Sequence, residues 1–148
     1  QGTKGGEVFL GEYKHTMDSK GRVVIPSKFR KELQQGCVVT KGLDNCLQIL
    51  TKKNWNQESE KMASLPSTDK TSRQLRRALF SGAVDSSLDS AGRIQIPENL
   101  RAYSAIKEND DVTVTGSGPV IEIWATKTWK KIQSDSDDAF ANINEVKG

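Results

Sequence analysis

Two arginines, Arg22 and Arg93, occupy the same place in a nine-residue stretch that the chain uses twice. The copies, residues 18–26 and 89–97, are offset by 71 residues and are identical at six of their nine positions. An arginine beside a glycine turn on a β-ribbon can enter the major groove of DNA and contact guanine through two hydrogen bonds. A solvated surface arginine is the alternative, and the repetition leaves both interpretations open.

Each copy has the composition of a tight turn followed by a short strand. An Asp-Ser pair can bond to nearby backbone N–H groups, a glycine supplies a positive φ, and a proline ends the β-branched run. The expected turn residues are Asp18, Gly21, Asp89 and Gly92. Strand alternation places Val23, Ile25, Ile94 and Ile96 inward. It places Arg22 and Arg93 on the opposite face, where we expect them to be exposed.

The distribution of charge favours the first half as the partner of an anion. Residues 11–53 hold nine Lys or Arg and four Asp or Glu, whereas residues 83–129 hold four and seven, and the whole chain carries a net charge of +3. The cations expected around the first turn are Lys14, His15, Lys20, Arg22, Lys28 and Arg30. We expect the lysines to contact phosphates and His15 to be a surface or phosphate-facing residue.

The same residues argue against an enzyme. The two Asp-Ser turns lack the immediate glycine and the apolar flanks of an aspartic protease dyad, and His15 is the only histidine. No zinc ligand set and no phosphate-binding glycine loop is present in the sequence, so neither a metal nor a cofactor is expected. Cys37 and Cys46 are expected to be buried, reduced thiols. No run reaches membrane-spanning length and no signal peptide is visible, so we expect a cytoplasmic protein without a membrane partner. If the basic turn binds DNA, the protein is expected to be nucleoid-associated.

Hydrophobic patterning predicts strands and short helices in the same order in both halves. The first half reads as a strand over 9–16 that makes the Asp18 turn a hairpin tip, then a helix over 27–33, strands at 38–40 and 47–50, and a helix over 52–62. The second half repeats this with a helix over 97–103, strands at 112–115 and 120–124, and a helix from Lys127 to about Ser134. A further helix over 70–80 joins the halves.

The fold class that follows is α+β, mainly β, with two pseudo-symmetric halves that pack together because neither can bury both faces alone. The expected divisions are an N-terminal extension or tag remnant (1–8), the first half (9–55), linker helices (56–82), the second half (83–129), and a C-terminal helix and tail (130–148). Trp55 and Trp129 occupy matching positions and are expected to anchor the core or an interface.

The chain resembles the MraZ family from Phe9 to about Trp129. The resemblance is carried by Phe9-Leu10-Gly11-Glu12-Tyr13, by the Asp18-Ser-Lys-Gly-Arg22 turn and by the stretch from Asp89 to Pro97. It implies two AbrB/SpoVT-like swapped-hairpin halves forming a small barrel with peripheral helices, and ring-shaped homo-oligomers. It also implies a bacterial transcriptional regulator, expected to be a repressor, that binds short direct repeats in double-stranded DNA upstream of the division and cell-wall gene cluster, including its own promoter. The DNA-contacting arginines of the family correspond to Arg22 and Arg93.

A second class of function stays open. A ring-forming scaffold or antitoxin-like interaction protein that acts without DNA would be consistent with the acidic second half. No small-molecule substrate is expected in either case. The apolar residues available for assembly are Phe9 and Leu10 near the start and Leu75, Leu79 and Phe80 in the linker helix.

Overall fold

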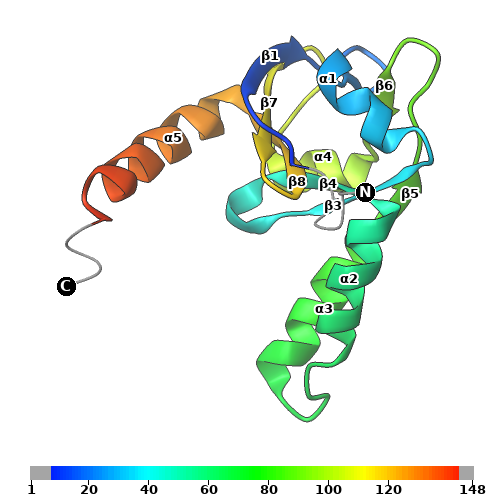
Figure 1. Cartoon of the computed structure of the whole chain (residues 1–148), viewed down its shortest axis with the longest axis vertical. Helices are drawn as coiled ribbons and strands as arrows, with labels where there is room; N and C mark the ends of the chain where they lie inside the picture. Colours follow the sequence, from blue (N-terminus) through cyan, green and yellow to red (C-terminus); the bar gives the residue numbers. More distant parts are fainter. Residues whose placement is uncertain (1–7, 144–148) are drawn as a thin grey trace.

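The computed structural model describes residues 8–143 of the chain, which form an α+β structure built mainly of antiparallel strands (Figure 1). The strands are β1 (Glu12–Thr16), β2 (Arg22–Val24), β3 (Cys37–Lys41), β4 (Leu47–Thr51), β5 (Val84–Ser86), β6 (Arg93–Gln95), β7 (Asp111–Ser117) and β8 (Val120–Ala125). The helices are α1 (Ser27–Arg30), α2 (Lys52–Ala63), α3 (Lys70–Gly82), α4 (Glu98–Ser104) and α5 (Thr126–Ala141).

Of the expected N-terminal extension, residues 1–7 lie outside the described range. Within the described range, no helix is both long and apolar enough to cross a membrane.

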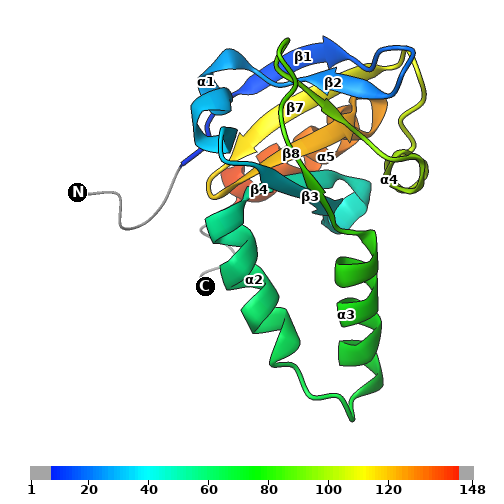
Figure 2. The same ribbon diagram turned by 90° about the vertical axis from the view of Figure 1, so that its right-hand side faces the viewer.

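The strands form two sheets. Six of them make one antiparallel sheet in the order β1-β7-β8-β4-β3-β5, and β2 and β6 make a separate two-stranded ribbon that crosses it (Figure 2). Strands β1 and β5 are the edges of the larger sheet, so backbone hydrogen bonds do not close the described strands into a continuous barrel. The ribbon and the sheet instead enclose one core between them.

The strands on either side of each repeated turn pair with the other half of the chain. β1 pairs with β7 and β2 with β6, while β5 pairs with β3. The expectation that the Asp18 turn is the tip of a hairpin between its own flanking strands is therefore wrong. Its strands separate because pairing β2 with β6 sets Val23 directly opposite Ile94, which buries both side chains on the core side of the ribbon.

The inward positions expected from alternation are confirmed. Val23, Ile25, Ile94 and Ile96 are fully buried, together with Leu33 after α1 and Leu100 in α4. Phe9, which the sequence offered for assembly, belongs to the core instead: its ring packs edge-on against Phe29 of α1 at a centroid distance of 5.2 Å. Leu10 beside it remains exposed.

The helices follow the predicted order, but α1 and α5 differ from their predicted lengths. α1 ends at Arg30, and the last three residues of the helix expected over 27–33 form a 3₁₀ turn (Lys31–Leu33). α2 and α3 form a helical hairpin that begins with a side-chain cap at each helix, Thr51 for α2 and Asp69 for α3. α5 continues to Ala141, beyond the expected end near Ser134, since no glycine or proline interrupts it. Trp55 and Trp129 are half-buried rather than central to the core, and they pack on Phe80 and Trp124 respectively.

Cys37 and Cys46 are buried, free cysteines, as predicted. Burial raises the pKa of the Cys37 thiol to about 11 and that of Cys46 to about 12. Both thiols are therefore protonated at neutral pH and act as small apolar core groups.

Neighbouring valines in β2 provide a test of which face of the ribbon is buried. Val23 is fully buried and Val24 is half-buried on the outer face. We expect Val23→Ala to lower the free energy of unfolding by about 2 kcal/mol, from the lost methyl groups and the cavity they leave. Val24→Ala, the matched control, should cost clearly less. Equal losses in urea unfolding would mean that the two faces are assigned wrongly.

Candidate nucleic-acid interface

The two repeated turns are joined to each other through the ends of the ribbon. The backbone N–H of Ile25 donates to the carbonyl of Gly92, and that of Ile96 donates to the carbonyl of Gly21, both at 2.9 Å. Both glycines have φ near +78°, a conformation that side chains other than glycine rarely adopt. Each turn is thus fixed by a strand that belongs to the opposite half.

An aspartate holds each repeated arginine in place. Asp18 accepts hydrogen bonds from the backbone N–H groups of Lys20 and Arg22, both at 2.9 Å, and from Nε of Arg22 at 2.8 Å. Asp89 accepts the equivalent bonds from Ala91 and Arg93, with Nε of Arg93 at 2.9 Å. The arrangement is the same in both halves because the turn sequence is the same.

These bonds keep both carboxylates ionised. For Asp18, burial opposes the charge, but the hydrogen bonds from Arg22 and Lys20 outweigh it and lower the pKa. For Asp89, the backbone N–H of Arg93 is the main cause of the lowered pKa. Each arginine therefore has a negatively charged partner at any pH near neutrality.

Arg22 and Arg93 lie on the outer face of the ribbon, as alternation predicts, but they are half-buried rather than exposed. Their side chains retain 25% and 31% of their accessible surface, because the clamping carboxylates cover one side of each guanidinium. The two arginines lie diagonally across the ribbon, and Nη1 of Arg93 comes within 3.9 Å of Oδ2 of Asp18. Within residues 8–143, no hydrogen bond occupies the Nη groups of either arginine, so those donors remain available to a ligand.

A second pair of arginines, Arg30 and Arg101, packs against the turn glycines and bonds to the ends of the ribbon strands. Nε of Arg30 donates to the carbonyl of Ile25 at 2.8 Å, and Nε of Arg101 donates to the carbonyl of Ile96 at 3.0 Å. The guanidinium of Arg30 lies against Gly92, and that of Arg101 lies against Gly21, where an added Cβ would be 3.1 Å from Cζ. The sequence indicated Arg30 only as one of the cations expected around the first turn and did not single out Arg101. The shared offset of 71 residues was the signal that could have identified the pair.

The two turns differ in their polar surroundings. Gln95 of β6 donates from Nε2 to the carbonyl of Lys20 at 2.7 Å, whereas the residue that matches it in β2, Val24, has no such group. Arg101, whose guanidinium lies against Gly21 of the first turn, makes an ion pair of 3.6 Å with Glu108. The first turn carries Lys20 and the second carries the uncharged Ala91. The residues of the turn itself are thus more cationic in the first turn than in the second.

The structure does not bring all the expected cations to the ribbon. Lys20 is exposed on the Asp18 turn. Lys14 is on the face of β1 opposite to Tyr13, which packs on Phe29, and it pairs with Glu12 at 3.0 Å. Lys28 is exposed on α1 beside Leu10 rather than at the turn. Of the cations expected around the first turn, Lys20 and Arg22 therefore lie there, whereas Arg30 lies against Gly92 of the second turn and Lys14 and Lys28 lie on β1 and α1.

His15 is half-buried in β1. Burial, with a smaller contribution from the positive charge of Arg30, lowers its pKa below the usual value. At neutral pH the imidazole is accordingly uncharged, and a phosphate contact by His15 would have to use a neutral N–H donor. Within residues 8–143, no group of three or more His, Cys, Asp or Glu is placed to hold a metal ion.

The supporting arginines provide a stability test of this site. Arg101→Ala removes a charged hydrogen bond to the carbonyl of Ile96, and we expect a loss of about 1–2 kcal/mol in the free energy of unfolding. Arg77→Ala, at an exposed position of α3, is the control and should change it by less than about 0.5 kcal/mol. A neutral result for Arg101→Ala in denaturant unfolding would contradict its role in supporting the turn.

The duplicated ribbon geometry agrees with a comparison to protein families. The family model described as "MraZ protein, putative antitoxin-like" matches the chain twice, over residues 8–78 and 79–146. The two matches cover the two halves that contribute one strand each to the ribbon, and together they span almost the whole sequence. The chain therefore belongs to the MraZ family.

Proposed function

We propose that this chain is a sequence-specific DNA-binding transcriptional regulator that reads double-stranded DNA with the outer face of the β2–β6 ribbon. The observation that carries the proposal is the pair of equivalent arginines, each oriented by an aspartate and each with free Nη donors. We further propose that its targets are the short direct repeats expected of the family, upstream of the division and cell-wall gene cluster and of its own promoter, and that it represses them.

The ribbon has suitable dimensions and chemistry for the major groove. That groove is about 12 Å wide and admits a two-stranded β-ribbon. A guanidinium can bond to O6 and N7 of guanine at once, provided that its plane is held in a fixed orientation. The Asp18 and Asp89 clamps supply that orientation before DNA arrives, because Nε is already engaged and only the Nη groups are free. Asp-held arginines therefore favour base contacts over phosphate contacts.

Electrostatics limit how tightly one copy can bind. The two clamping carboxylates offset the charges of Arg22 and Arg93, which leaves Lys20, Arg30 and the outlying lysines to attract phosphate. Several copies in a homo-oligomeric ring would raise the affinity for repeated sites through effective concentration, by factors of about 10² to 10⁴. This is the reason for proposing direct repeats rather than a single site as the target.

The finer description of the fold belongs to the same proposal. The strands around each turn pair with the opposite half, which supports reading the two halves as AbrB/SpoVT-like swapped hairpins. The proposed role is non-enzymatic and needs neither a metal nor a cofactor. It places the protein on the nucleoid in the cytoplasm.

A scaffold or antitoxin-like interaction protein is the second candidate. The antitoxin-like description of the family and the net negative charge of residues 83–129 favour it. A mobility-shift assay separates the two candidates, using the upstream region of the chain's own gene and a scrambled duplex at moderate salt. Binding that prefers the native sequence supports the regulator, and equal or absent binding supports the scaffold.

Substitution of the clamped arginines tests base recognition. We expect Arg22→Ala to weaken specific binding by about 1–3 kcal/mol per site, because one bidentate base contact is lost. Arg22→Lys, the control for charge, should retain non-specific binding and lose specificity, since lysine lacks the planar fork. Arg93→Ala should weaken binding less, because its turn lacks a lysine. Equal losses from Arg22→Ala and Arg93→Ala would show that the difference between the turns does not matter.

Lysine substitutions test which side of the molecule faces the phosphates. Lys20→Ala should weaken binding to every sequence alike and reduce the slope of log K against log salt by about one unit. Lys14→Ala should change that slope less, because Lys14 is on the far face of β1 and already pairs with Glu12. The reverse order in salt titrations would mean that the DNA lies across β1 and not along the ribbon.

A further inference from the structure

The outer part of α5 is a helix without contacts to cover its apolar side chains. Near its start α5 packs on the body, with the rings of Trp129 and Trp124 at 5.5 Å and Gln133 bonded to Glu12. From Ser134 to Ile143 every residue is exposed, including 78% of Phe140 and 48% of Ile143. Figure 1 shows this part extending away from the rest of the protein.

This segment makes no packing contacts of its own and continues a helix whose first turns pack on the body. Most helical stability in proteins comes from packing of an apolar face, so a partner on this face would stabilise the segment. Phe140 continues the face of α5 that begins with Trp129 and Ile132, since these positions recur at helical spacing. The face that packs on the body in the first turns of α5 is thus left open in the last ones.

The first half of the chain indicates what kind of surface covers this face. α2 follows β4 as α5 follows β8, and Trp55 of α2 matches Trp129 of α5. α2 is covered by α3, where Phe80 packs edge-on against Trp55 at 5.8 Å. Among the described residues, α5 has no comparable helix packed against it. A helix hairpin like α2–α3 is therefore the type of surface that α5 lacks.

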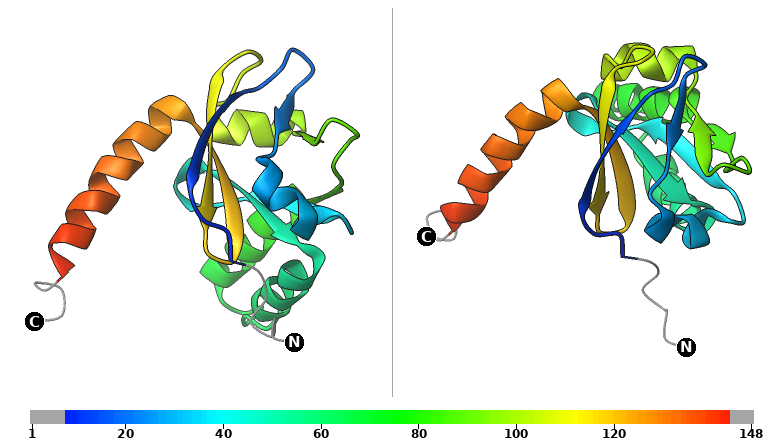
Figure 3. Two further views of the ribbon diagram at one scale, coloured as in Figure 1. Left: turned by 45° about the horizontal axis from the view of Figure 1, so that its top comes forward. Right: turned by 90° about the horizontal axis from the view of Figure 1, so that it is seen from above.

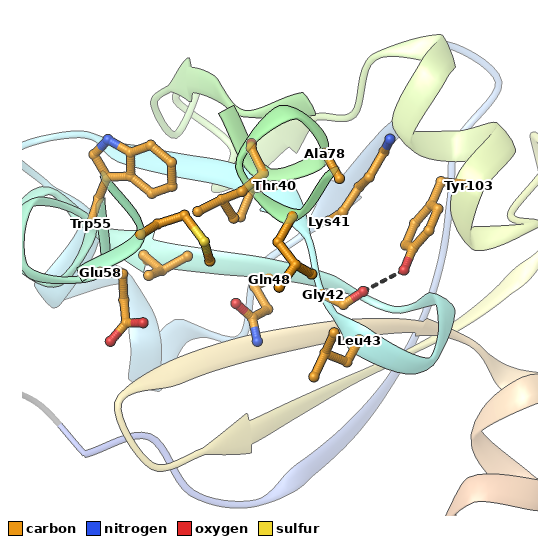
Figure 4. Close-up of a pocket in the computed structure, with 13 residues that line it drawn as sticks. Thr40, Lys41, Gly42, Leu43, Gln48, Trp55, Glu58, Ala78 and Tyr103 are labelled. Carbon is orange, nitrogen blue, oxygen red and sulfur yellow. Dashed lines mark hydrogen bonds between the residues drawn. The ribbon is translucent and has the colours of Figure 1, made fainter. Parts of the chain in front are cut away.

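The α2–α3 hairpin itself has an open apolar groove of about 450 Å³ (Figure 4). Its apolar lining comes from α2, α3, the β3–β4 turn and α4: Leu43, Trp55, Met62, Leu75, Leu79 and Tyr103. Leu75 is 45% exposed and Leu43 is 78% exposed. Tyr103 closes one end of the groove with a hydrogen bond to the carbonyl of Gly42.

The outer part of α5 and helix α3 carry opposite charges. The outer part of α5 carries Asp135, Asp137 and Asp138 and no cation up to Ala141. α3 carries Lys70, Arg73, Arg76 and Arg77 and no acidic residue, and the charged residues of the groove lining itself are Lys41 and Glu58. Within residues 8–143, no ion pair engages these three aspartates.

We propose that residues 134–143 of one copy dock into the α2–α3 groove of a second copy, with Phe140 as the buried anchor. α5 and the α2–α3 hairpin leave the body as two separate projections (Figure 1), and both views of Figure 3 show α5 extending away from the body. Because α5 is one continuous helix from β8, it cannot bend back into its own groove without breaking. The contact is head-to-tail, because the donor surface and the acceptor surface differ. This inference rests on the homo-oligomer in the proposed function and is independent of DNA recognition.

Paired substitutions on α5 test the anchor, with sedimentation velocity measured without DNA. Phe140→Glu places a charge in the proposed contact, and we expect the association constant to fall by roughly tenfold or more. Ala141→Glu adds the same charge one residue further along, on another face of α5, and should assemble like the wild type. Leu75→Glu, on the acceptor groove, should reproduce the effect of Phe140→Glu. All three positions are exposed, so far-UV circular dichroism should show a folded protein in each case.

Cross-linking distinguishes docking between copies from docking within one copy. Ala139→Cys and Ala78→Cys place one accessible thiol on α5 and one in the groove, while the raised pKa values of the buried Cys37 and Cys46 keep the natural thiols unreactive. A mixture of the two single variants with a short bis-maleimide should give a cross-linked pair of chains. Ala141→Cys mixed with Ala78→Cys is the matched control and should give several-fold less.

Each outcome decides the proposal. Smaller species for Phe140→Glu and Leu75→Glu, with mixed-chain cross-links, support it. A monomeric wild type, wild-type assembly by Phe140→Glu, or mixed-chain cross-linking no greater than in the Ala141→Cys control overturns it. Because no DNA is present, these results leave the DNA-binding proposal to its own mobility-shift test.

Discussion

Backbone pairing between β2 and β6 is the interaction on which the rest of the structure depends. Each strand has only three residues, and an isolated two-stranded ribbon of this kind is marginal in water. It persists here because Val23 and Ile94 are buried beneath it, and because Arg30 and Arg101 bond to the carbonyls at its two ends. The outer face can then carry polar side chains without contributing to the core, which is why the clamped arginines can be offered to a ligand.

Much of the fold was predictable from local sequence, and its pairing was not. Alternation and turn chemistry act over a few residues, so the inward positions from Val23 to Ile96 and the two glycine turns could be assigned in advance. Partner choice is non-local: nothing in residues 9–26 says that β1 pairs with β7 rather than with β2. The length of α5 was underestimated because its polar residues after Ser134 give only a weak periodic signal.

The candidate site was predictable to a similar degree. Arg22 and Arg93 could be singled out because they recur in equivalent positions, and alternation assigned them to the correct face. Their partial burial could not be foreseen, since it comes from the carboxylate clamps formed within each folded turn. Arg101 was not singled out because it lies in a segment of net negative charge, residues 83–129. Its contact, Gly21, is also 80 positions away in the sequence.

The α2–α3 hairpin has a consequence for the thermodynamics of the ribbon. A symmetric dimer of two identical half-chains could build the same ribbon, but its stability would depend on protein concentration. Here the hairpin joins both halves covalently, so β2 and β6 meet in a unimolecular step and do not separate on dilution. Covalent linkage also frees the two turns to diverge, because a substitution at Lys20 leaves Ala91 unchanged, whereas in an identical dimer it would alter both ends of the ribbon at once.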